Sequence, residues 1–315
     1  MHANVLEVDQ LSVSFDTDDG RVDAVKEVSF VIPRGKCVAL VGESGSGKSV
    51  TSFSLLRLIQ DPGKITGGHI HIYPGDEPAM DIVQLKENDE RLYHLRGGLI
   101  SIIFQEPMTA LSPVHSIGNQ ITEAIHLHRG LKGKQADALA IEMLRRVGIP
   151  SPEQRLKQYP HEFSGGMRQR VVIAMALACE PELLIADEPT TALDVTIQAQ
   201  ILRLIKNLQK ETGTSVLFIT HDIGVVAQVA DEVCVMYKGR IVESGTVREV
   251  LKKPIHPYTK GLLSAIPGLH QPGERLPTID QVLAGKDIAT PHPMVSLPGG
   301  RKVAWPEAEI PAEYR

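Results

Sequence analysis

The sequence contains few cysteines, few aromatic residues and no excess of positive charge. Its 315 residues include three cysteines, Cys37, Cys179 and Cys234, which lie far apart and form no C-x-x-C pair. This spacing argues against a disulfide framework and predicts buried thiols in a reducing compartment. The net charge of −5 argues against a global basic field that would recruit nucleic acid, although it leaves room for a local basic groove.

Long hydrophobic runs and a targeting segment are also missing. The longest apolar run, Val171 to Cys179, covers nine residues between Arg170 and Glu180, which is about half of what a membrane-crossing helix needs. The first residues have neither the positive start nor the apolar core of a signal peptide. We therefore expect a cytoplasmic protein that meets a membrane only through a partner.

The pattern that organises the chain is a glycine-rich stretch directly after the apolar run Cys37 to Val41. It reads Gly42-Glu43-Ser44-Gly45-Ser46-Gly47-Lys48-Ser49 and matches G-x-x-x-x-G-K-[ST]. Its glycines let successive backbone N–H groups point into one concavity that attracts a polyphosphate. Lys48 can then reach the terminal phosphates, and the Ser49 hydroxyl can ligate Mg²⁺. A purely structural turn has no use for the Lys-Ser pair, so the pattern predicts a nucleotide triphosphate site.

Two alternating segments, Val5 to Phe15 and Val22 to Ile32, precede this stretch and predict an antiparallel lead-in. Phe15 lies near the end of the first segment and has two interpretations. Its ring could stack on a purine base, a contact worth ~1–3 kcal/mol, or it could pack in the core. The sequence leaves both open.

Polar residues follow three further predicted strands. Gln105 comes directly after Leu99 to Phe104, Asp187 and Glu188 close Leu183 to Ala186, and His221 closes Ser215 to Thr220. Open α/β sheets bind ligands beyond the carboxyl ends of their strands. The position suits Gln105 for reaching a metal or water, Asp187 for holding Mg²⁺ and Glu188 for activating water. The alternative is that the acidic pair simply ends an ordinary strand. Two adjacent carboxylates repel each other, however, and would raise the free energy of the folded protein unless a cation lay beside them.

Between these strands the apolar residues recur with the spacing of a helix. Residues 107–178 predict a helical insertion with helices at Ile117 to His128, Lys134 to Val147 and Gly165 to Cys179. Ser164 is a good N-cap, and Gly165 and Gly166 allow a close approach to that helix start. Taken alone, this segment could be a helix cap and nothing more.

The last part of the chain changes in composition. Residues 233–245 predict a hairpin that turns at Lys238-Gly239, and Tyr258 to Ala265 predicts a helix. Residues 267–315 then contain eight of the 21 prolines and show no sustained periodicity. We therefore expect an extended, loosely ordered tail or linker over 267–315, after a domain at 1–266.

Together these patterns resemble the ATP-binding cassette ATPases over about residues 4 to 265. The resemblance identifies Gly42 to Ser49 as the Walker A loop, Gln105 as the Q-loop residue and Ser164-Gly165-Gly166-Met167 as the signature. It likewise identifies Asp187-Glu188 as the end of Walker B, Ala192-Leu193-Asp194 as the D-loop and His221 as the switch histidine. The implied fold is α/β: a mixed RecA-like sheet with the antiparallel lead-in, the helical subdomain at about 107–178 and the extended C-terminal tail.

A closer resemblance is to the ATPase subunits of dipeptide, oligopeptide and glutathione importers, with nickel and microcin importers also similar. It rests on the segments Gly42 to Val50, Ile103 to Leu111, Glu188 to Gln200 and His256-Pro257-Tyr258-Thr259. Met167 departs from the Gln found in many cassettes. Many of these subunits also have a cysteine cluster after the His-Pro-Tyr-Thr segment, whereas no cysteine follows Cys234 here, so we expect no iron–sulfur cluster. The tail resembles the linker of fused glutathione importers, which leaves open that this is one half of a longer protein.

The resemblance implies how ATP is bound and hydrolysed. Two cassettes sandwich two ATP molecules, and the signature of one faces the Walker A loop of the other. Lys48 and Mg²⁺ supply charge, with Ser49, Gln105 and Asp187 at the metal, while Glu188 polarises the attacking water and His221 fixes the γ-phosphate. The residues implied in nucleotide binding are Phe15, Gly42, Glu43, Ser44, Gly45, Ser46, Gly47, Lys48, Ser49, Val50, Gln105, Ser164, Gly165, Gly166, Asp194 and His221.

The implied partners are a second cassette, two transmembrane permease subunits and, indirectly, a solute-binding protein, with no nucleic acid. The implied place is the cytoplasmic face of the inner membrane. Chromosome-repair ATPases share these motifs, but they interrupt the cassette with a long coiled coil, and residues 107–178 hold no sustained heptads. A regulatory cassette that binds ATP without hydrolysis is disfavoured by Lys48, Glu188 and His221. The sequence does not choose among the solutes or say whether the partner cassette is identical, different or fused.

Overall fold

The protein is seen here in a computed structural model that describes residues 2–75, 77–266, 279–286, 288 and 290–315. Its chain divides into two units, each assembled from separate stretches. The first unit comprises Met1–Val5, Pro33–Gly35 and Ile72–Leu217, and the second comprises Leu6–Ile32, Lys36–His71 and Phe218–Arg315. Strand β8 (Ser215–Thr220) runs through the boundary between them.

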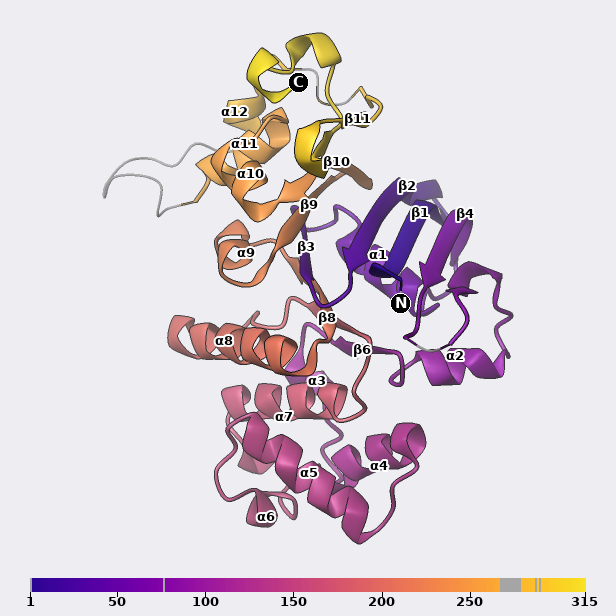
Figure 1. The fold of residues 1–315 in the computed structure, drawn as a ribbon, viewed down its shortest axis with the longest axis vertical. Helices are drawn as coiled ribbons and strands as arrows, with labels where there is room; N and C mark the ends of the chain where they lie inside the picture. Colours follow the sequence, from indigo (N-terminus) through magenta and orange to yellow (C-terminus); the bar gives the residue numbers. More distant parts are fainter. Residues whose placement is uncertain (1, 76, 267–278, 287, 289) are drawn as a thin grey trace. The chain divides into compact units, whose positions relative to one another are not determined.

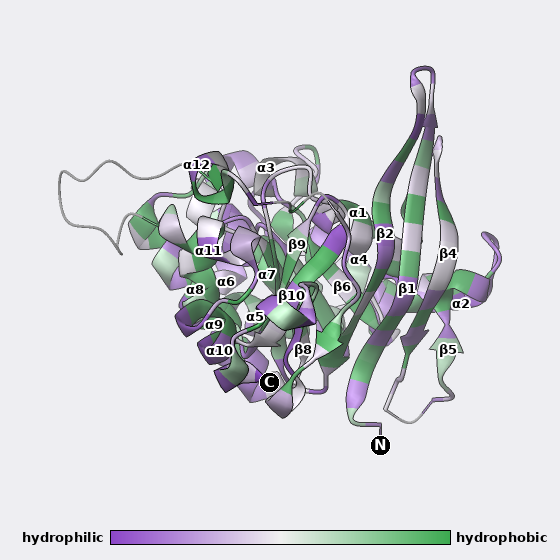
Figure 2. Ribbon diagram, turned by 90° about the horizontal axis from the view of Figure 1, so that it is seen from above, coloured by the Kyte–Doolittle hydropathy of each residue, from purple (hydrophilic) through white to green (hydrophobic). Residues whose placement is uncertain are grey.

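An antiparallel sheet opens the second unit. Its strands β1 (Asn4–Thr17), β2 (Gly20–Pro33) and β4 (Gly63–Ile72) lie in the order β2-β1-β4. In Figure 2 apolar and polar residues succeed one another along β1 and β2, as expected of strands with one buried face. The predicted lead-in hairpin is thus confirmed.

A second set of strands in this unit surrounds β3 (Cys37–Val41), whose five residues are all buried. Strand β3 pairs in parallel with β9 (Glu232–Tyr237), which pairs antiparallel with β10 (Arg240–Thr246). The hairpin turns at Lys238 and Gly239, as the sequence predicts, with φ of 46° and 82°. Positive φ at both central residues gives a type I′ turn, whose twist matches that of the flanking strands.

Helices of the second unit pack on this hairpin. Tyr258 and Leu263 from one of them join a buried cluster with Ala39, Val41 and Val235. Helix α10 begins with a capping box formed by Thr246 and Glu249. The helices are α1 (Lys48–Leu55), α9 (Ile223–Val229), α10 (Val247–Lys252), α11 (Pro257–Ser264) and α12 (Ile279–Leu283); Figure 1 shows α10, α11 and α12 grouped together.

The C-terminal segment differs in part from the loosely ordered tail that the sequence predicts. Residues 267–278 lie outside the described residues. Residues 290–315, however, contain β11 (Val295–Ser296) and β12 (Lys302–Val303), and β12 extends the sheet by pairing with β10. Apolar side chains from this segment form a small core with Ile255, which precedes α11; the members from the segment are Leu297, Val303, Trp305 and Ile310.

A buried ion pair fixes this segment. Glu243 on β10 is fully buried, Arg301 is 4% exposed, and Arg301 Nη2 lies 2.6 Å from Glu243 Oε1. The Glu243 carboxylate also accepts backbone N–H bonds from Ile255 and His256, each at 3.0 Å. One buried carboxylate therefore ties β10, the start of α11 and the C-terminal segment together.

We expect Arg301→Met to lower the free energy of unfolding by about 3 kcal/mol, because it leaves the Glu243 charge buried without its cation. Urea denaturation measures this loss. Arg240→Met is the matched control, since Arg240 pairs with Glu27 at the surface, at 3.3 Å, and exposed pairs contribute little. Equal midpoints for the two variants would contradict the role given to Arg301.

The first unit contains a parallel strand pair and the helical insertion. Strand β6 (Ile100–Ile103) pairs with β7 (Leu183–Asp187), with Ile103 opposite Ala186. The predicted helices are confirmed within one or two residues at most ends, and Figure 1 shows α4 to α7 lying together. They are α4 (Ile117–Arg129), α5 (Lys134–Arg146), α6 (Pro152–Arg155) and α7 (Gly165–Leu177), with α2 (Glu90–Leu95), α3 (Pro107–Ala110), α8 (Val195–Thr212) and the short strand β5 (Met80–Asp81) elsewhere in the unit.

In the part of the chain that the structure describes, no helix combines the length and apolarity needed to cross a bilayer.

The three cysteines are buried and unbridged, as predicted. Burial raises the pKa of the Cys179 thiol to about 11 and that of the Cys234 thiol to about 12. Both thiols are therefore held in their protonated form.

Candidate nucleotide-binding site

The glycine-rich loop lies in the second unit and connects β3 to α1, as the pattern predicts. A Cβ atom at Gly42 would lie 2.2 Å from the Met236 carbonyl oxygen. A Cβ atom at Gly47, where φ is 102°, would lie 2.6 Å from the carbonyl oxygen of Ala24. Neither position accommodates a side chain, so the close packing of this loop requires both glycines.

Lys48 is folded back onto the loop. Its side chain is 5% exposed, and Nζ donates to the carbonyl oxygens of Gly42 and Glu43, both at 2.8 Å. The Ser46 hydroxyl lies 3.4 Å from the same ammonium. Ser49, the next residue, is exposed. The loop thus holds a positive charge inside its own curve and leaves a hydroxyl at the surface beside it.

Two contacts from far along the sequence support the loop, and sequence reasoning missed both. Gly239 N donates to the Ser46 carbonyl at 2.9 Å, and Glu43 N donates to the Tyr258 hydroxyl at 3.0 Å. For the Tyr258 contact the sequence did offer a signal, the His256-Pro257-Tyr258-Thr259 segment, but that segment was interpreted only as evidence of resemblance to a subfamily. In the structure this segment lies beside the phosphate loop.

Two other predicted residues lie in the same unit. Phe15 is half-buried, and its ring lies over Gly63, where an added Cβ atom would be 2.5 Å from Phe15 Cε1. Packing, one of the two interpretations of Phe15, is thus present, and part of the ring stays exposed. His221 is exposed and stands between β8 and α9.

The first unit brings Gln105 and Glu188 into contact. Gln105 Nε2 lies 3.2 Å from Glu188 Oε2, which also accepts the Thr191 hydroxyl at 3.1 Å. This contact follows from topology, because β6 and β7 are parallel neighbours and both residues come just after their carboxyl ends. Asp187 ends β7 and is 4% exposed. Glu188 adopts φ of 47°, a left-handed conformation that costs of order 1 kcal/mol for such a residue and is typical of functional sites.

The signature and the D-loop also meet in this unit. Ser164 caps α7 by accepting the Met167 N–H, and Asp194 caps α8 by accepting the Thr196 and Ile197 N–H groups, both at 3.0 Å. A Cβ atom at Gly166 would lie 2.9 Å from Ile197 Cγ2. The two helix starts are therefore packed together, and the second signature glycine permits their approach.

A second contact that the sequence did not reveal joins α7 to the loop after Glu188. Gln169 is fully buried, and its Nε2 donates to the Pro189 carbonyl at 2.5 Å. The hydrogen bond fixes the backbone immediately after Glu188. Helix α7 thus restrains the acidic loop directly.

The candidate residues therefore fall into two groups, each within one unit. The second unit holds Phe15, Gly42 to Val50 and His221; the first holds Gln105, Ser164, Gly165, Gly166, Asp187, Glu188 and Asp194. The hydroxyl of Ser49, the amide oxygen of Gln105 and the carboxylate of Asp187 are hard oxygen donors. Each of these oxygens is of the kind that Mg²⁺ prefers as a ligand.

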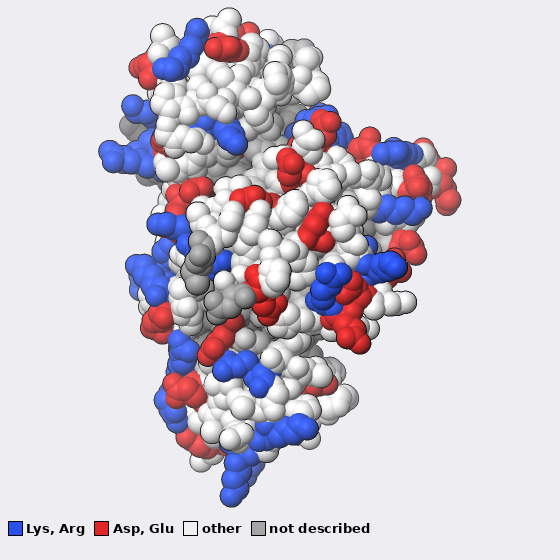
Figure 3. Space-filling view, turned by 45° about the vertical axis from the view of Figure 1, so that its right-hand side comes forward, with Lys and Arg blue, Asp and Glu red and all other residues white. Residues whose placement is uncertain are grey.

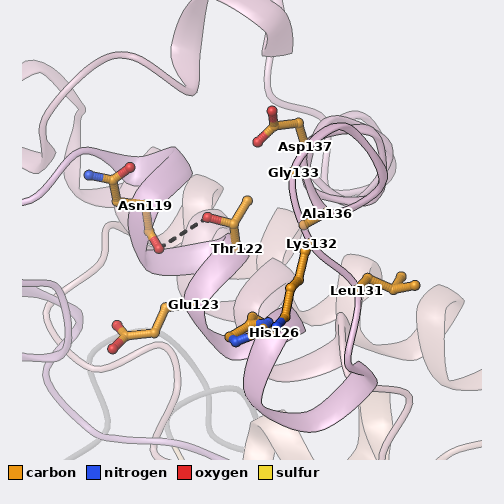
Figure 4. Close-up of a pocket in the computed structure, with 9 residues that line it drawn as sticks. All are labelled: Asn119, Thr122, Glu123, His126, Leu131, Lys132, Gly133, Ala136 and Asp137. Atoms are coloured by element: carbon orange, nitrogen blue, oxygen red, sulfur yellow. Dashed lines mark hydrogen bonds between the residues drawn. The ribbon is translucent and has the colours of Figure 1, made fainter.

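Two surface hollows flank α4 in the first unit. One, of about 460 Å³, lies between α4 and α5 (Figure 4), with Asn119, Thr122 and Glu123 on its α4 side. The other, of about 540 Å³, shares Asn119 and Glu123 and is lined by Ala110, Ser112 and His115 from the segment after Gln105. On the face shown in Figure 3, basic and acidic side chains are interspersed rather than gathered into a basic patch.

Comparison with known proteins identifies the family. A family model described as "ABC transporter" matches residues 25–191, which include the phosphate loop, Gln105 and Asp187-Glu188. The chain belongs to the ABC transporter ATPases. A second family model, "Oligopeptide/dipeptide transporter, C-terminal region", matches residues 242–288 of this ABC ATPase, which include His256 to Thr259.

Curated relatives agree. The ATPase is 55% identical over 271 residues to the oligopeptide transport ATP-binding protein OppD of Bacillus subtilis, covering 86% of this chain and 74% of the relative. It is 52% identical to the dipeptide transport ATP-binding protein DppD of the same organism, covering 94% and 84%. The glutathione import ATP-binding protein GsiA of Escherichia coli is 47% identical over 304 residues, which are 96% of this chain and 47% of that protein.

Solved structures confirm the predicted fold class. A dimeric ATP-binding cassette in a post-hydrolysis state, bound to ADP and phosphate, has a TM-score of 0.66 at 28% identity, covering 77% of this chain and 99% of that one. A cassette of the cbiONQ transporter complex from Clostridium perfringens has a TM-score of 0.65 at 28% identity, covering 80% and 92%. This ABC ATPase thus shares its α/β cassette with a protein whose structure contains bound ADP and phosphate.

Proposed function

We propose that this ATPase powers the import of small peptides, of the dipeptide, oligopeptide or glutathione class, through a membrane permease. The observation that carries the proposal is that one chain combines the cassette match over residues 25–191 with the peptide-transporter region over 242–288. The relatives named for oligopeptide, dipeptide and glutathione transport support the same solute class. On this proposal the protein acts at the cytoplasmic face of the inner membrane.

In the proposed reaction the loop amides from Gly45 to Val50 and the start of α1 bind the phosphates of ATP, while Phe15 stacks on the base. The Lys48 ammonium, held by the carbonyl oxygens of Gly42 and Glu43, donates its remaining proton to the terminal phosphates. Phosphoryl transfer mostly needs positioning and neutralisation of charge, with little covalent help. The buried ammonium of Lys48 is suited to that task.

Glu188 is the proposed base that orients and polarises the attacking water, because its carboxylate is held by Gln105 and Thr191. His221 is proposed to hold the γ-phosphate. Ser49, Gln105 and Asp187 would hold Mg²⁺, which when bound supplies positive charge to the phosphates.

A second cassette completes the proposed site. Ser164, Gly165 and Gly166 stand at the start of α7, whose backbone N–H groups and dipole favour an anion. Facing the phosphate loop of a partner cassette, this helix start would bind the partner's γ-phosphate. Asp194, packed beside it at the start of α8, would belong to the same contact. The dimeric cassette with ADP and phosphate supports this arrangement.

The permease is proposed to dock beside α4. The hollow of about 540 Å³ is lined both by α4 and by the segment that follows Gln105. A helix of the permease seated there would sense movement of the Gln105 segment, which contacts Glu188. Hydrolysis and transport would be coupled through that segment.

The test is ATP hydrolysis by this chain alone and with the genomically neighbouring permease in vesicles. We expect activity to rise when the solute-binding protein and one of dipeptides, oligopeptides or glutathione are added. The Glu188→Gln variant, which we expect to be inactive, is the control that measures ATP hydrolysis by contaminating enzymes. If nickel alone raised the activity, the chain would still be an importer ATPase, but the proposed peptide solute would be wrong.

Adding DNA in the same assay tests the alternative that the chain is a chromosome-repair ATPase. Among the described residues the longest helix is α8, with 18 residues, and the insertion is built from short helices rather than a coiled coil. We expect DNA to leave hydrolysis unchanged. Activity raised by DNA and indifferent to the permease would overturn the import function.

A further inference from the structure

One of the two remote contacts of the phosphate loop is made by a buried phenol. Tyr258, in the first turn of α11, is 0% exposed, and its hydroxyl accepts the Glu43 N–H at 3.0 Å. Tyr258 and Glu43 are 215 positions apart in sequence, and both belong to the second unit. The helix of the peptide-transporter region therefore contacts the second residue of the loop directly.

The contact reaches Lys48 through a single peptide group. The Glu43 N–H that donates to Tyr258 and the Gly42 carbonyl that accepts from Lys48 Nζ, at 2.8 Å, belong to the same peptide unit. Because a peptide unit is planar, the direction of its N–H fixes the direction of its C=O. Holding the N–H on Tyr258 therefore holds the carbonyl towards Lys48. The Glu43 carbonyl, in the next peptide, accepts Lys48 Nζ as well, at 2.8 Å.

Tyr258 is itself firmly placed. Its ring centroid lies 4.3 Å from that of Tyr237 on β9, and its N–H donates to His256 Nδ1 at 3.1 Å. The His256 N–H in turn donates to the buried Glu243 carboxylate. Burial raises the pKa of the Tyr258 hydroxyl well above its usual range, so the oxygen stays neutral and the hydroxyl keeps its proton at physiological pH.

We propose that Tyr258 is a positioning residue of the nucleotide site, whose hydroxyl orients the Gly42–Glu43 peptide and through it the ammonium of Lys48. This rests on the proposed role of Lys48 at the phosphates. Without the hydroxyl, Tyr258 no longer holds the Glu43 N–H in one direction. The Gly42 carbonyl of the same peptide is then no longer held towards the Lys48 ammonium. The loss affects substrate and transition state alike, so it raises KM and leaves kcat nearly unchanged.

Tyr258→Phe tests the proposal, because it keeps the ring and its packing on Tyr237 and removes only the hydroxyl. The loss of the protein acceptor of the Glu43 N–H and a poorly placed ammonium predict about five- to tenfold weaker equilibrium binding of a fluorescent ATP analogue with Mg²⁺. We expect KM for ATP to rise by the same factor and kcat to stay within about twofold. A purely structural tyrosine would lower the melting temperature without changing the affinity of the folded protein.

Tyr237→Phe is the matched control, since it removes a phenol hydroxyl from the neighbouring ring and leaves the Glu43–Tyr258 hydrogen bond in place. Its ATP affinity is expected to equal that of the wild type. Affinity of Tyr258→Phe within twofold of wild type would overturn the positioning role. If wild-type protein binds no ATP, the proposed nucleotide function fails instead, so the two failures are distinguishable.

A measurement on the wild-type protein keeps the proposal testable if Tyr258→Phe does not fold. Hydrogen exchange at the Glu43 amide should be at least about tenfold slower than in an unstructured peptide, because the amide is bonded to a buried oxygen. Exchange at the unprotected rate would show that the hydrogen bond is absent in solution and overturn the proposal.

Discussion

Replacing Glu188 with Gln is expected to abolish ATP turnover, by at least about a hundredfold, while ATP still binds. A general base contributes typically about 10²–10⁴-fold to a rate, and an amide cannot accept the proton. The geometry favours a clean substitution, because Gln keeps the shape of Glu and its carbonyl oxygen can accept from Gln105 or Thr191, the present donors to Glu188. Binding of ATP without turnover should also stabilise a closed dimer.

Steady-state hydrolysis and size-exclusion chromatography with MgATP measure these two effects. Glu211→Gln provides the control, since Glu211 lies on α8 and forms an exposed pair with Arg146 at 3.3 Å. That variant should hydrolyse ATP at the wild-type rate and elute as wild type does. Near-wild-type hydrolysis by Glu188→Gln would remove Glu188 from its proposed role.

Lys48→Ala is expected to weaken ATP binding about 10- to 100-fold. Charge-assisted hydrogen bonds are worth about 1.5–3 kcal/mol each, and a factor of ten corresponds to about 1.4 kcal/mol. Lys48 is the buried cation of the loop, and its ammonium is held at 2.8 Å from two loop carbonyls. Its removal takes away both the charge and the order that it gives to the loop.

Equilibrium titration with a fluorescent nucleotide measures this loss. Lys210→Ala is the control, because Lys210 is an exposed lysine in the last turn of α8. Its affinity should match that of the wild type. Undiminished affinity in Lys48→Ala would contradict the assignment of the loop to nucleotide binding.

Local pattern and strand topology were enough to predict much of the site. The loop from Gly42 to Ser49 follows from residue types, since only glycine fits at positions 42 and 47. The meeting of Gln105 and Glu188 follows from two short apolar strands that pair in parallel. Both predictions depend on interactions within a few residues or on one general rule of sheet topology.

Contacts between distant segments could not be predicted in this way. The hydrogen bonds from Glu43 to Tyr258 and from Gln169 to Pro189 depend on where a helix packs, and neither residue pair stands out by composition or spacing. Residues 290–315 escaped prediction because β11 and β12 have two residues each. Strands that short show no alternation, and burial of Trp305 and Val303 in the small core around Ile255 decides their structure instead.

The remote support of the phosphate loop has a consequence for the order of events during synthesis. The loop leaves the ribosome long before Gly239 and Tyr258 are made, although these residues bind Ser46 and Glu43. At about 5–20 residues per second, the 215 positions that separate Glu43 from Tyr258 take about 10–40 s to translate. A nascent chain therefore exposes its glycine-rich segment for that interval without its final geometry, and its capacity to bind nucleotide matures only as residues 239–258 emerge.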